Sequence, residues 1–402
     1  MAIVTIFFSG TGATSENHVN KNYAFGELIA VLAKNAVGQE MIDYIQVDGV
    51  GSGNHSEWRK HAKDDVYGKQ FGKLGGRGID SNMNHVLNSL KGVPQDDGDY
   101  LSRAKSLLRD IKPQKKESFW HFGVSSAYKK YQMECKALAG DLKYAMSMQR
   151  ANMRAERKSN PISQVNMIGW SRGGVSCFEL ANRMQDDPAL SHIPVNIFAC
   201  DPVPGGMNAF KNYKALGPNV QQVVCLFAED ERSMAFKARM PRLHKSTKYY
   251  TTMMPGRHGT LVGCSTTSGN KKGDHLILGP GRITRDFAEK VLVGWGSRIK
   301  PSTMLNLSKS EILEQYAQVK KNSAHFEKMH ANVYTVQNRL FYGSGDRIGQ
   351  QSERWCGIPI HRFQFPGITK NYGDAVNRHH YDVQKNNIFA INGISGALVN
   401  IL

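Results

Sequence analysis

Residues 169–174 read Gly-Trp-Ser-Arg-Gly-Gly, so one serine has a glycine two positions away on either side. A serine that attacks a carbonyl carbon projects from a sharp strand-to-helix turn, and such a turn has no space for side chains two residues before and after it. Gly169 and Gly173 meet this requirement because glycine has no Cβ. The pattern therefore predicts nucleophilic chemistry at Ser171, in which the hydroxyl forms a covalent acyl intermediate.

The hydroxyl of Ser171 is a weak nucleophile near neutral pH, so it needs a histidine base and a carboxylate that orients the histidine. Where this turn occurs, the acid and then the histidine follow the serine along the chain. His258 is the preferred base, because it lies in the glycine-flanked loop 254–263 after an apolar run. The other candidates are His275, as runner-up, and His379 and His380.

Two carboxylates at the ends of apolar runs are candidate acids, and a carboxylate at a strand end is also a common turn former. Asp201 ends the first such run after Ser171, and Asp230 ends the next one, within the charged run 229–232. We favour Asp201, because the Pro-Val-Pro sequence after it would stiffen its turn. For Asp230 we expect a structural role at a solvated strand end or in local ion pairs.

The oxyanion that forms when a serine attacks an ester must receive hydrogen bonds. The backbone N–H of Arg172 is the first candidate donor, since it follows the nucleophile directly. Thr11 and Gly12, in a Gly-Thr-Gly loop after the first apolar run, are candidates for the second. The same loop could instead form a phosphate-binding turn, although the rest of a dinucleotide or P-loop pattern is missing.

Short apolar runs separated by turn residues and helical patterns must position these groups. The runs predicted to be strands are 3–8, 42–47, 165–168, 195–200, 223–228 and 249–254. Strands that alternate with helices predict an α/β fold, here an α/β-hydrolase-like, mostly parallel sheet with helices on both faces. Ligands of such sheets bind beyond the carboxyl ends of the strands, where the candidate residues lie.

Two segments depart from this alternation and define the expected organisation. Residues 92–160, rich in Lys, Arg, Gln and Ser, are expected to form a helical insertion over one end of the sheet in a catalytic domain spanning 1–299. Residues 300–402 are expected to form a C-terminal extension that packs on this domain. The extension opens with a helical pattern at 308–330, and Ser308 with Glu311 is typical of a capping box.

The balance of 52 Lys and Arg against 34 Asp and Glu gives a net charge of +18. This charge indicates either a well-solvated surface or attraction to a polyanion. An anionic lipid surface is favoured over nucleic acid, because no zinc-finger spacing or ribonucleoprotein-type aromatic motif is present. We predict no metal and no cofactor.

Six scattered cysteines without a C-x-x-C pair predict free, mostly buried thiols. Residues 1–8 lack the basic region of a signal peptide and predict a first strand, and no apolar stretch is long enough for a membrane-spanning helix. We therefore expect synthesis in the cytoplasm without a signal peptide, so that any action outside it needs another route.

Taken in chain order, the motifs resemble those of the type VI secretion lipase effectors, whose catalytic domain is an α/β-hydrolase. The similar segments are Ser-Gly-Thr-Gly at 9–12, Gly-Val-Gly at 49–51, Ser-Arg-Gly-Gly at 171–174, Asp-Pro-Val at 201–203, Ala-Glu-Asp-Glu-Arg at 228–232 and Pro-Gly-Arg-His at 255–258. Ser9 stands where the family usually has aspartate, and Gly174 where it usually has alanine.

The resemblance implies the triad Ser171, Asp201 and His258 and phospholipase A activity in an antibacterial toxin. It also implies a phospholipid membrane as substrate, a cognate immunity protein, a component of the secretion apparatus as partner, and action at the membrane or periplasm of a target cell. The alternatives are an esterase, thioesterase or amidase with a soluble substrate, and a non-catalytic binding protein that keeps the fold.

Overall fold

The structure is a computed structural model. It describes residues 2–52, 78–93, 98–112, 126–204, 212–228, 230–231, 238, 241–267, 277–322, 324–326 and 329.

The sheet contains six strands in the order β2-β1-β3-β4-β5-β6, and every pair of neighbours is parallel. All six predicted runs form strands, which confirms the expected α/β fold. The strands are β1 (Ala2–Phe8), β2 (Tyr44–Val47), β3 (Ile162–Trp170), β4 (Val195–Cys200), β5 (Val220–Ala228) and β6 (Lys248–Met254).

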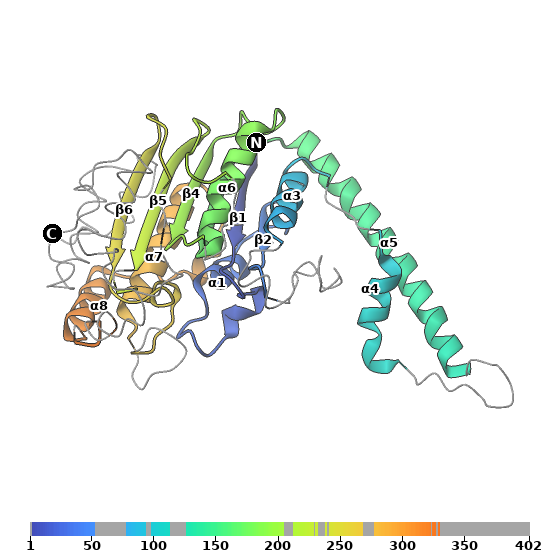
Figure 1. Cartoon of the computed structure of the whole chain (residues 1–402), viewed down its shortest axis with the longest axis horizontal. Helices are drawn as coiled ribbons and strands as arrows, with labels where there is room; N and C mark the ends of the chain where they lie inside the picture. The colour runs from blue at the N-terminus through green and yellow to red at the C-terminus, as the bar shows by residue number, and fades with distance from the viewer. Residues whose placement is uncertain are drawn as a thin grey trace.

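Helices cover both faces of this sheet (Figure 1). One face carries α3 (Ile79–Leu90) and α6 (Arg172–Asp186), and the other carries α1 (Leu28–Lys34), α7 (Gly279–Gly294) and α8 (Lys309–Lys321). Alternate strand side chains enter opposite cores, as the period of two requires. On β4, Ile197 joins the core under α6, whereas Phe198 joins the core under α7. Single 3-10 turns lie at Ser15–Val19, Arg109–Ile111, Thr260–Val262 and Pro301–Thr303.

The first part of the predicted C-terminal extension packs into the core beside α7. Ile312 and Val319 of α8, together with Phe326 and Met329, are buried in the same core as α7. The capping box is present, because the carboxylate of Glu311 accepts the N–H of Ser308 at 2.8 Å. Residues 330–402 lie outside the described residues.

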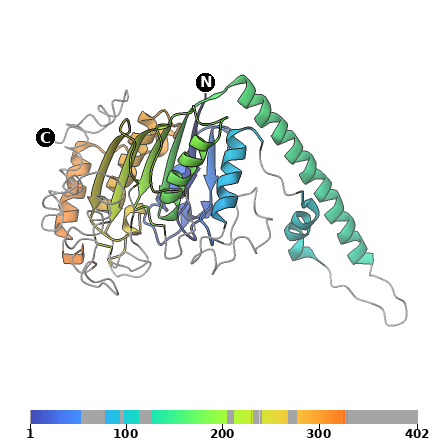
Figure 2. The same cartoon turned by 45° about the horizontal axis from the view of Figure 1, so that its top comes forward.

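In its described residues the insertion is helical, as predicted, with α4 (Tyr100–Leu107) and the long helix α5 (Ser126–Ser159) as its main elements. Its expected position over one end of the sheet is wrong, because the two helices form an arm that points away from the body (Figures 1 and 2). The arm has a small core of its own, with Ala104 of α4 against Tyr131 and Cys135 of α5. Near the end of α5, Met153 enters the main core and anchors the arm.

The five cysteines in the described part of the chain are free and buried, as predicted. They are Cys135, Cys177, Cys200, Cys225 and Cys264, and Cys356 lies outside the described residues. No described helix combines the length and the apolar character that crossing a membrane requires.

Glu27 makes the fold sensitive to pH, because it is fully buried and caps the first turn of α1. Its carboxylate accepts the N–H groups of Ile29 and Ala30, each at 3.0 Å. Burial raises the pKa of Glu27 from 4.5 to about 7, against the lowering effect of these two hydrogen bonds. The neutral acid is therefore the form that stabilises the fold, fully below pH 4.5, and this contribution is lost as the pH rises towards 7.

We expect the Glu27→Gln variant to lose this dependence, because the amide stays neutral. Between pH 4 and 8, the free energy of unfolding of the unaltered chain should fall by roughly 3 kcal/mol more than that of the variant. Urea denaturation at several pH values measures the difference. If the free energy of unfolding changed with pH in the same way for both proteins, Glu27 would be ruled out as the source of the pH dependence.

Candidate active site

Ser171 stands at the turn between β3 and α6, with φ of 60° and ψ of −126°. A non-glycine residue in this region is strained, which is the hallmark of a nucleophile turn. Neighbouring backbone fixes the conformation: the N–H of Ser171 donates to the carbonyl of Cys200 at 3.0 Å, and its own carbonyl accepts the N–H of Val203 at 3.1 Å. The end of β4 thus holds the turn in place.

The two glycines around Ser171 are required by close backbone contacts. A Cβ at Gly169 would lie 2.3 Å from the carbonyl oxygen of Gly173, and a Cβ at Gly173 would lie 2.2 Å from that of Phe8. A similar contact explains Gly49 in the second motif, where a Cβ would lie 1.7 Å from the carbonyl oxygen of Gly10. Backbone atoms therefore make the contacts between the turn after β3 and the loops that follow β1 and β2, and these contacts leave no space for side chains.

This packing predicts losses of different size for alanine at two neighbouring glycines at the start of α6. Gly173→Ala should lower the free energy of unfolding by at least about 2 kcal/mol, because the methyl group collides with backbone that cannot move freely. Gly174→Ala is the comparison and should destabilise the fold less, since its Cβ would lie 3.0 Å from the Cβ of Pro202 and at least 3.2 Å from backbone atoms, and alanine favours the helix. Thermal and urea unfolding of both variants measure the difference, and equal stabilities would contradict the prediction.

His258 follows β6, and its imidazole contacts the carboxylate of Asp201 at the end of β4. The distance from Nδ1 of His258 to Oδ2 of Asp201 is 2.7 Å, and only 5% of the histidine and 0% of the aspartate are exposed. The other carboxylate oxygen accepts the N–H of Ala228 at 3.1 Å. With Nδ1 donating to Asp201, Nε2 is the nitrogen that can accept a proton.

Trp170 connects this histidine to the nucleophile turn. Its indole Nε1–H donates to the carbonyl of His258 at 3.1 Å, and the two ring centroids lie 5.0 Å apart. Since Trp170 immediately precedes Ser171, these contacts bring the histidine loop to the serine. The three residues predicted as a triad therefore gather at the carboxyl edge of the sheet, on the loops after β3, β4 and β6.

Burial raises the pKa of the Cys200 thiol well above its ordinary value, and the carboxylates of Glu27 and Asp201 add to this effect. A thiol in this environment stays protonated near neutral pH and is a poor nucleophile. Ser171, whose N–H donates to the carbonyl of Cys200, is thus a better candidate for covalent chemistry than Cys200 itself.

Asp230 and Glu231 are buried, which corrects the expectation of a solvated strand end at Asp230. The carboxylate of Asp230 accepts the N–H of Gly256 at 2.7 Å, and its own N–H donates to the carbonyl of Gly256 at 3.0 Å. The carboxylate of Glu231 accepts the N–H of His258 at 3.3 Å. Both acids hold the backbone of the histidine loop, while Asp201 contacts the imidazole itself.

The predicted oxyanion donors differ in their availability. The N–H of Gly12 donates to the carbonyl of Val50 at 3.1 Å, so in this conformation it is not available to an oxyanion, contrary to expectation. The N–H of Thr11 has no acceptor within the described part of the chain. Arg172 is the first residue of α6, where backbone N–H groups have no partner inside the helix.

Comparison with known proteins gives no family and no close relative. No family model and no curated protein matches the chain. Among solved structures, an uncharacterized protein from Pseudomonas aeruginosa is similar at a TM-score of 0.46 and 13% identity, over 99% of this chain and 63% of that one. A Tle1 effector bound to the VgrG spike of a type 6 secretion system is similar at a TM-score of 0.27 and 14% identity, over 65% of this chain and 51% of that one. The chain thus spans less than two thirds of the length of either structure.

Two residues that support the site have no distinctive signal in the sequence. Trp170 occupies a position of the serine motif that any residue may fill, and Glu231 belongs to the same charged run as Asp230. Only their positions, one residue before the nucleophile and directly after a strand, could have indicated these roles. His275, His379 and His380 lie outside the described residues.

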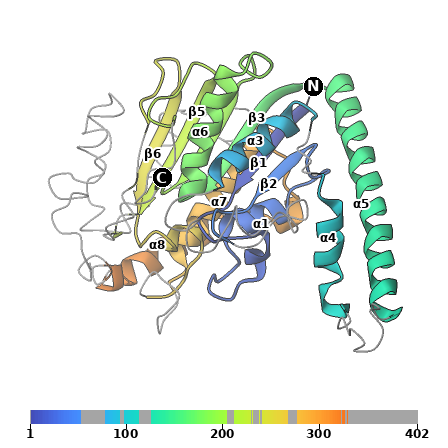
Figure 3. The same cartoon turned by 45° about the vertical axis from the view of Figure 1, so that its right-hand side comes forward.

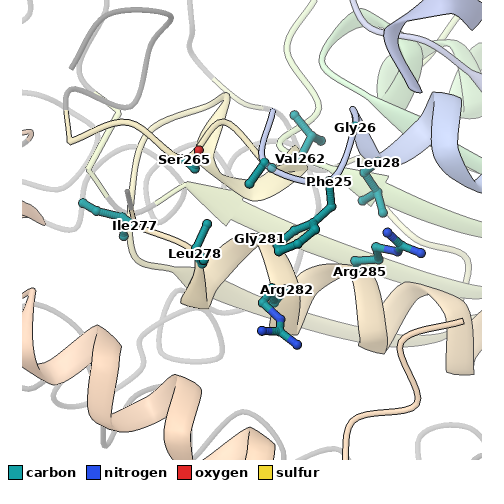
Figure 4. A pocket seen from close by; sticks show the side chains of 12 residues that line it. Phe25, Gly26, Leu28, Val262, Ser265, Ile277, Leu278, Gly281, Arg282 and Arg285 are labelled. Carbon is teal, nitrogen blue, oxygen red and sulfur yellow. The ribbon is translucent and has the colours of Figure 1, made fainter. Parts of the chain in front are cut away.

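A small apolar pocket borders the histidine loop (Figure 4). Val262, Gly263 and Ser265, which follow His258, form one wall, and the other walls come from the loop before α1 and from the start of α7. Arg282 lies at this pocket, with its guanidinium 5.5 Å from the ring centroid of Phe25. The pocket thus combines apolar walls with a cation.

Proposed function

We propose that the protein is a serine ester hydrolase that works through an acyl-enzyme. The observation that carries this proposal is the 2.7 Å contact of His258 with Asp201 beside a strained serine turn. Nε2 of His258 would take the proton of Ser171 as the hydroxyl attacks the ester carbonyl, and would then give it to the leaving alcohol. Water would release the acid in a second round of the same steps.

The backbone N–H groups of Thr11 and Arg172 would stabilise the oxyanion in both rounds. Of the two loop amides expected from the sequence, Thr11 is preferred because the N–H of Gly12 is already bound to Val50. Asp201 would orient His258 and stabilise the imidazolium that forms during each proton transfer.

The substrate class we propose is the phospholipid ester, cleaved in the manner of a phospholipase A. The order of the sequence motifs motivates this choice, and the net charge of +18 suits an anionic bilayer. The apolar pocket that borders the histidine loop, with Arg282 of α7 beside it, suits a molecule with an apolar chain and an anionic group. The motif resemblance alone motivates the proposed role as an antibacterial toxin, with a type VI secretion component and an immunity protein as partners and a target-cell membrane or periplasm as its place of action.

Three substrates separate this proposal from its alternatives: phosphatidylglycerol vesicles, a soluble short-chain nitrophenyl ester and an acyl thioester. We expect fatty acid release from the vesicles to exceed turnover of the two soluble substrates. Preference for either soluble substrate would assign the chain to the esterases or thioesterases. Labelling of Ser171 by a fluorophosphonate probe tests catalysis as such, and an unlabelled, inactive protein would indicate a binding protein on the same fold.

A further inference from the structure

The long helix α5 has apolar residues on two opposite sides. Its inner side packs on α4 through Tyr131, Cys135 and neighbouring residues. The other side carries what we call the outer stripe, seven apolar or small residues at spacings of three and four. These spacings match the helical period, so the residues share one face. The outer stripe is Met133, Ala137, Gly140, Tyr144, Met148, Ala151 and Ala155.

The outer stripe is exposed: 71% of Met133, 68% of Tyr144 and 45% of Met148 are accessible to solvent. Figure 3 shows α4 between α5 and the body of the protein, so the side of α5 opposite α4 faces outwards. A second molecule could approach this side without meeting the sheet or its covering helices.

No contact within the described part of the chain explains Gly140 in the middle of the stripe. A Cβ built on it would have no described atom within 4 Å, although glycine weakens a helix interior relative to alanine. A glycine on an exposed helix face allows a second helix to pack closely against it, because small residues reduce the distance between helix axes.

The charges beside the stripe are separated by sign. With Met133 and Ala137 as core positions of a heptad, Glu134 and Asp141 fall on one flank, and Lys129 and Lys136 on the other. None of these four side chains forms an ion pair within the described residues. Flanking charges of this kind set the partner and the orientation of paired helices.

We propose that the outer stripe binds the same stripe of a second copy of this chain, with the two α5 helices parallel and in register. In that arrangement each flank meets the opposite flank of the other helix. Lys129 would then face the partner's Glu134, and Lys136 would face the partner's Asp141. An antiparallel pair would bring lysine to lysine and acid to acid. A lipid surface would account for the lysines and the exposed methionines, but not for the acidic flank or for Gly140.

The oligomeric state of the full chain, measured by sedimentation equilibrium, tests this pairing. We expect a dimer, and for the Lys129→Glu/Lys136→Glu variant a dissociation constant at least about tenfold higher. Adding Glu134→Lys and Asp141→Lys to that variant should restore the dimer, because the flanks are then exchanged. Lys105→Glu/Lys112→Glu on the α4 side changes the charge equally and should leave the dimer intact.

Gly140→Ala gives an independent test. Alanine favours the helix, so a weaker dimer could not be attributed to unfolding of α5. We expect at least about a tenfold weaker dimer from the added methyl group in the contact. The cysteine introduced by Ala137→Cys should form an intermolecular disulfide on oxidation, whereas the cysteine introduced by Ala145→Cys, off the stripe, should not.

A protein that remains monomeric at every concentration would overturn the proposal, and so would cross-linking that is equal at the two cysteine positions. A monomer that binds anionic vesicles through the stripe would assign this face to a lipid surface instead. All of these measurements can be made on the Ser171→Ala variant. A negative result for dimerisation is therefore distinguishable from a negative result for the proposed catalysis.

Discussion

Ser171→Ala is expected to reduce ester turnover by on the order of 10⁶-fold and to leave the fold unchanged. The substitution removes only the hydroxyl oxygen, and alanine can keep the backbone hydrogen bonds to Cys200 and Val203 that hold the turn. Residual activity would come from the oxyanion donors and substrate binding, which the variant retains.

Purified variant and unaltered protein should be compared by fatty acid release and by fluorophosphonate labelling. Ser176→Ala, at a buried serine within α6, is the matched control and should retain both activities. Turnover of the Ser171 variant close to that of the unaltered protein would exclude the proposed nucleophile. Circular dichroism of both variants distinguishes lost chemistry from lost structure.

Asp201→Asn is expected to lower the rate about 10⁴-fold, because an amide that faces Nδ1 favours the wrong tautomer of the imidazole. The prediction rests on the 2.7 Å contact between Asp201 and His258 and on the burial of both residues. The shape of the two side chains is the same, and the carbonyl oxygen of asparagine can still accept the N–H of Ala228. The loss should therefore appear in turnover far more than in stability.

Asp230→Asn provides the comparison, since it alters the other candidate acid in the same way. Asp230 accepts the N–H of Gly256 and does not touch the imidazole in the contacts described above. We expect a loss of turnover of less than about tenfold, together with a lower unfolding temperature from the weakened loop. A large loss at Asp230 with an active Asp201 variant would move the proposed acid one strand further along the chain.

The strands and the serine turn could be predicted because local rules determine them. Apolar runs bounded by turn residues formed all six strands, and the glycines around Ser171 proved necessary for backbone contacts that any such turn makes. The order of the strands could not be deduced, because it depends on which elements pack together over long distances. The capping box at Ser308 was predictable because it involves neighbours in sequence.

The direction of the arm and the burial of Asp230 could not be predicted, because both depend on contacts between residues far apart in the sequence. The composition of residues 92–160 indicates helices, but α5 has two apolar sides, and composition alone does not say which side meets the protein. The charged run after β5 is typical of a solvated loop, and only the tertiary contact of Asp230 with Gly256 turns it inwards. Local patterns thus identified the candidate residues, while their supports came from distant contacts.

The positive φ angles of Ser171 and Asp201 have a consequence for how this chain would evolve. They are two of the four described non-glycine residues with positive φ, and such conformations cost about 1–3 kcal/mol each. Net stabilities of proteins are only about 5–15 kcal/mol, so this is a sizeable fraction. Glycine at 171 would relieve the strain there and remove the proposed nucleophile, whereas glycine at 201 would also leave the buried N–H groups of Ala228 and His258 without their acceptor. In a library of random variants selected only for heat resistance, clones with glycine at 171 should therefore become enriched, and the most heat-resistant descendants would lack the proposed nucleophile.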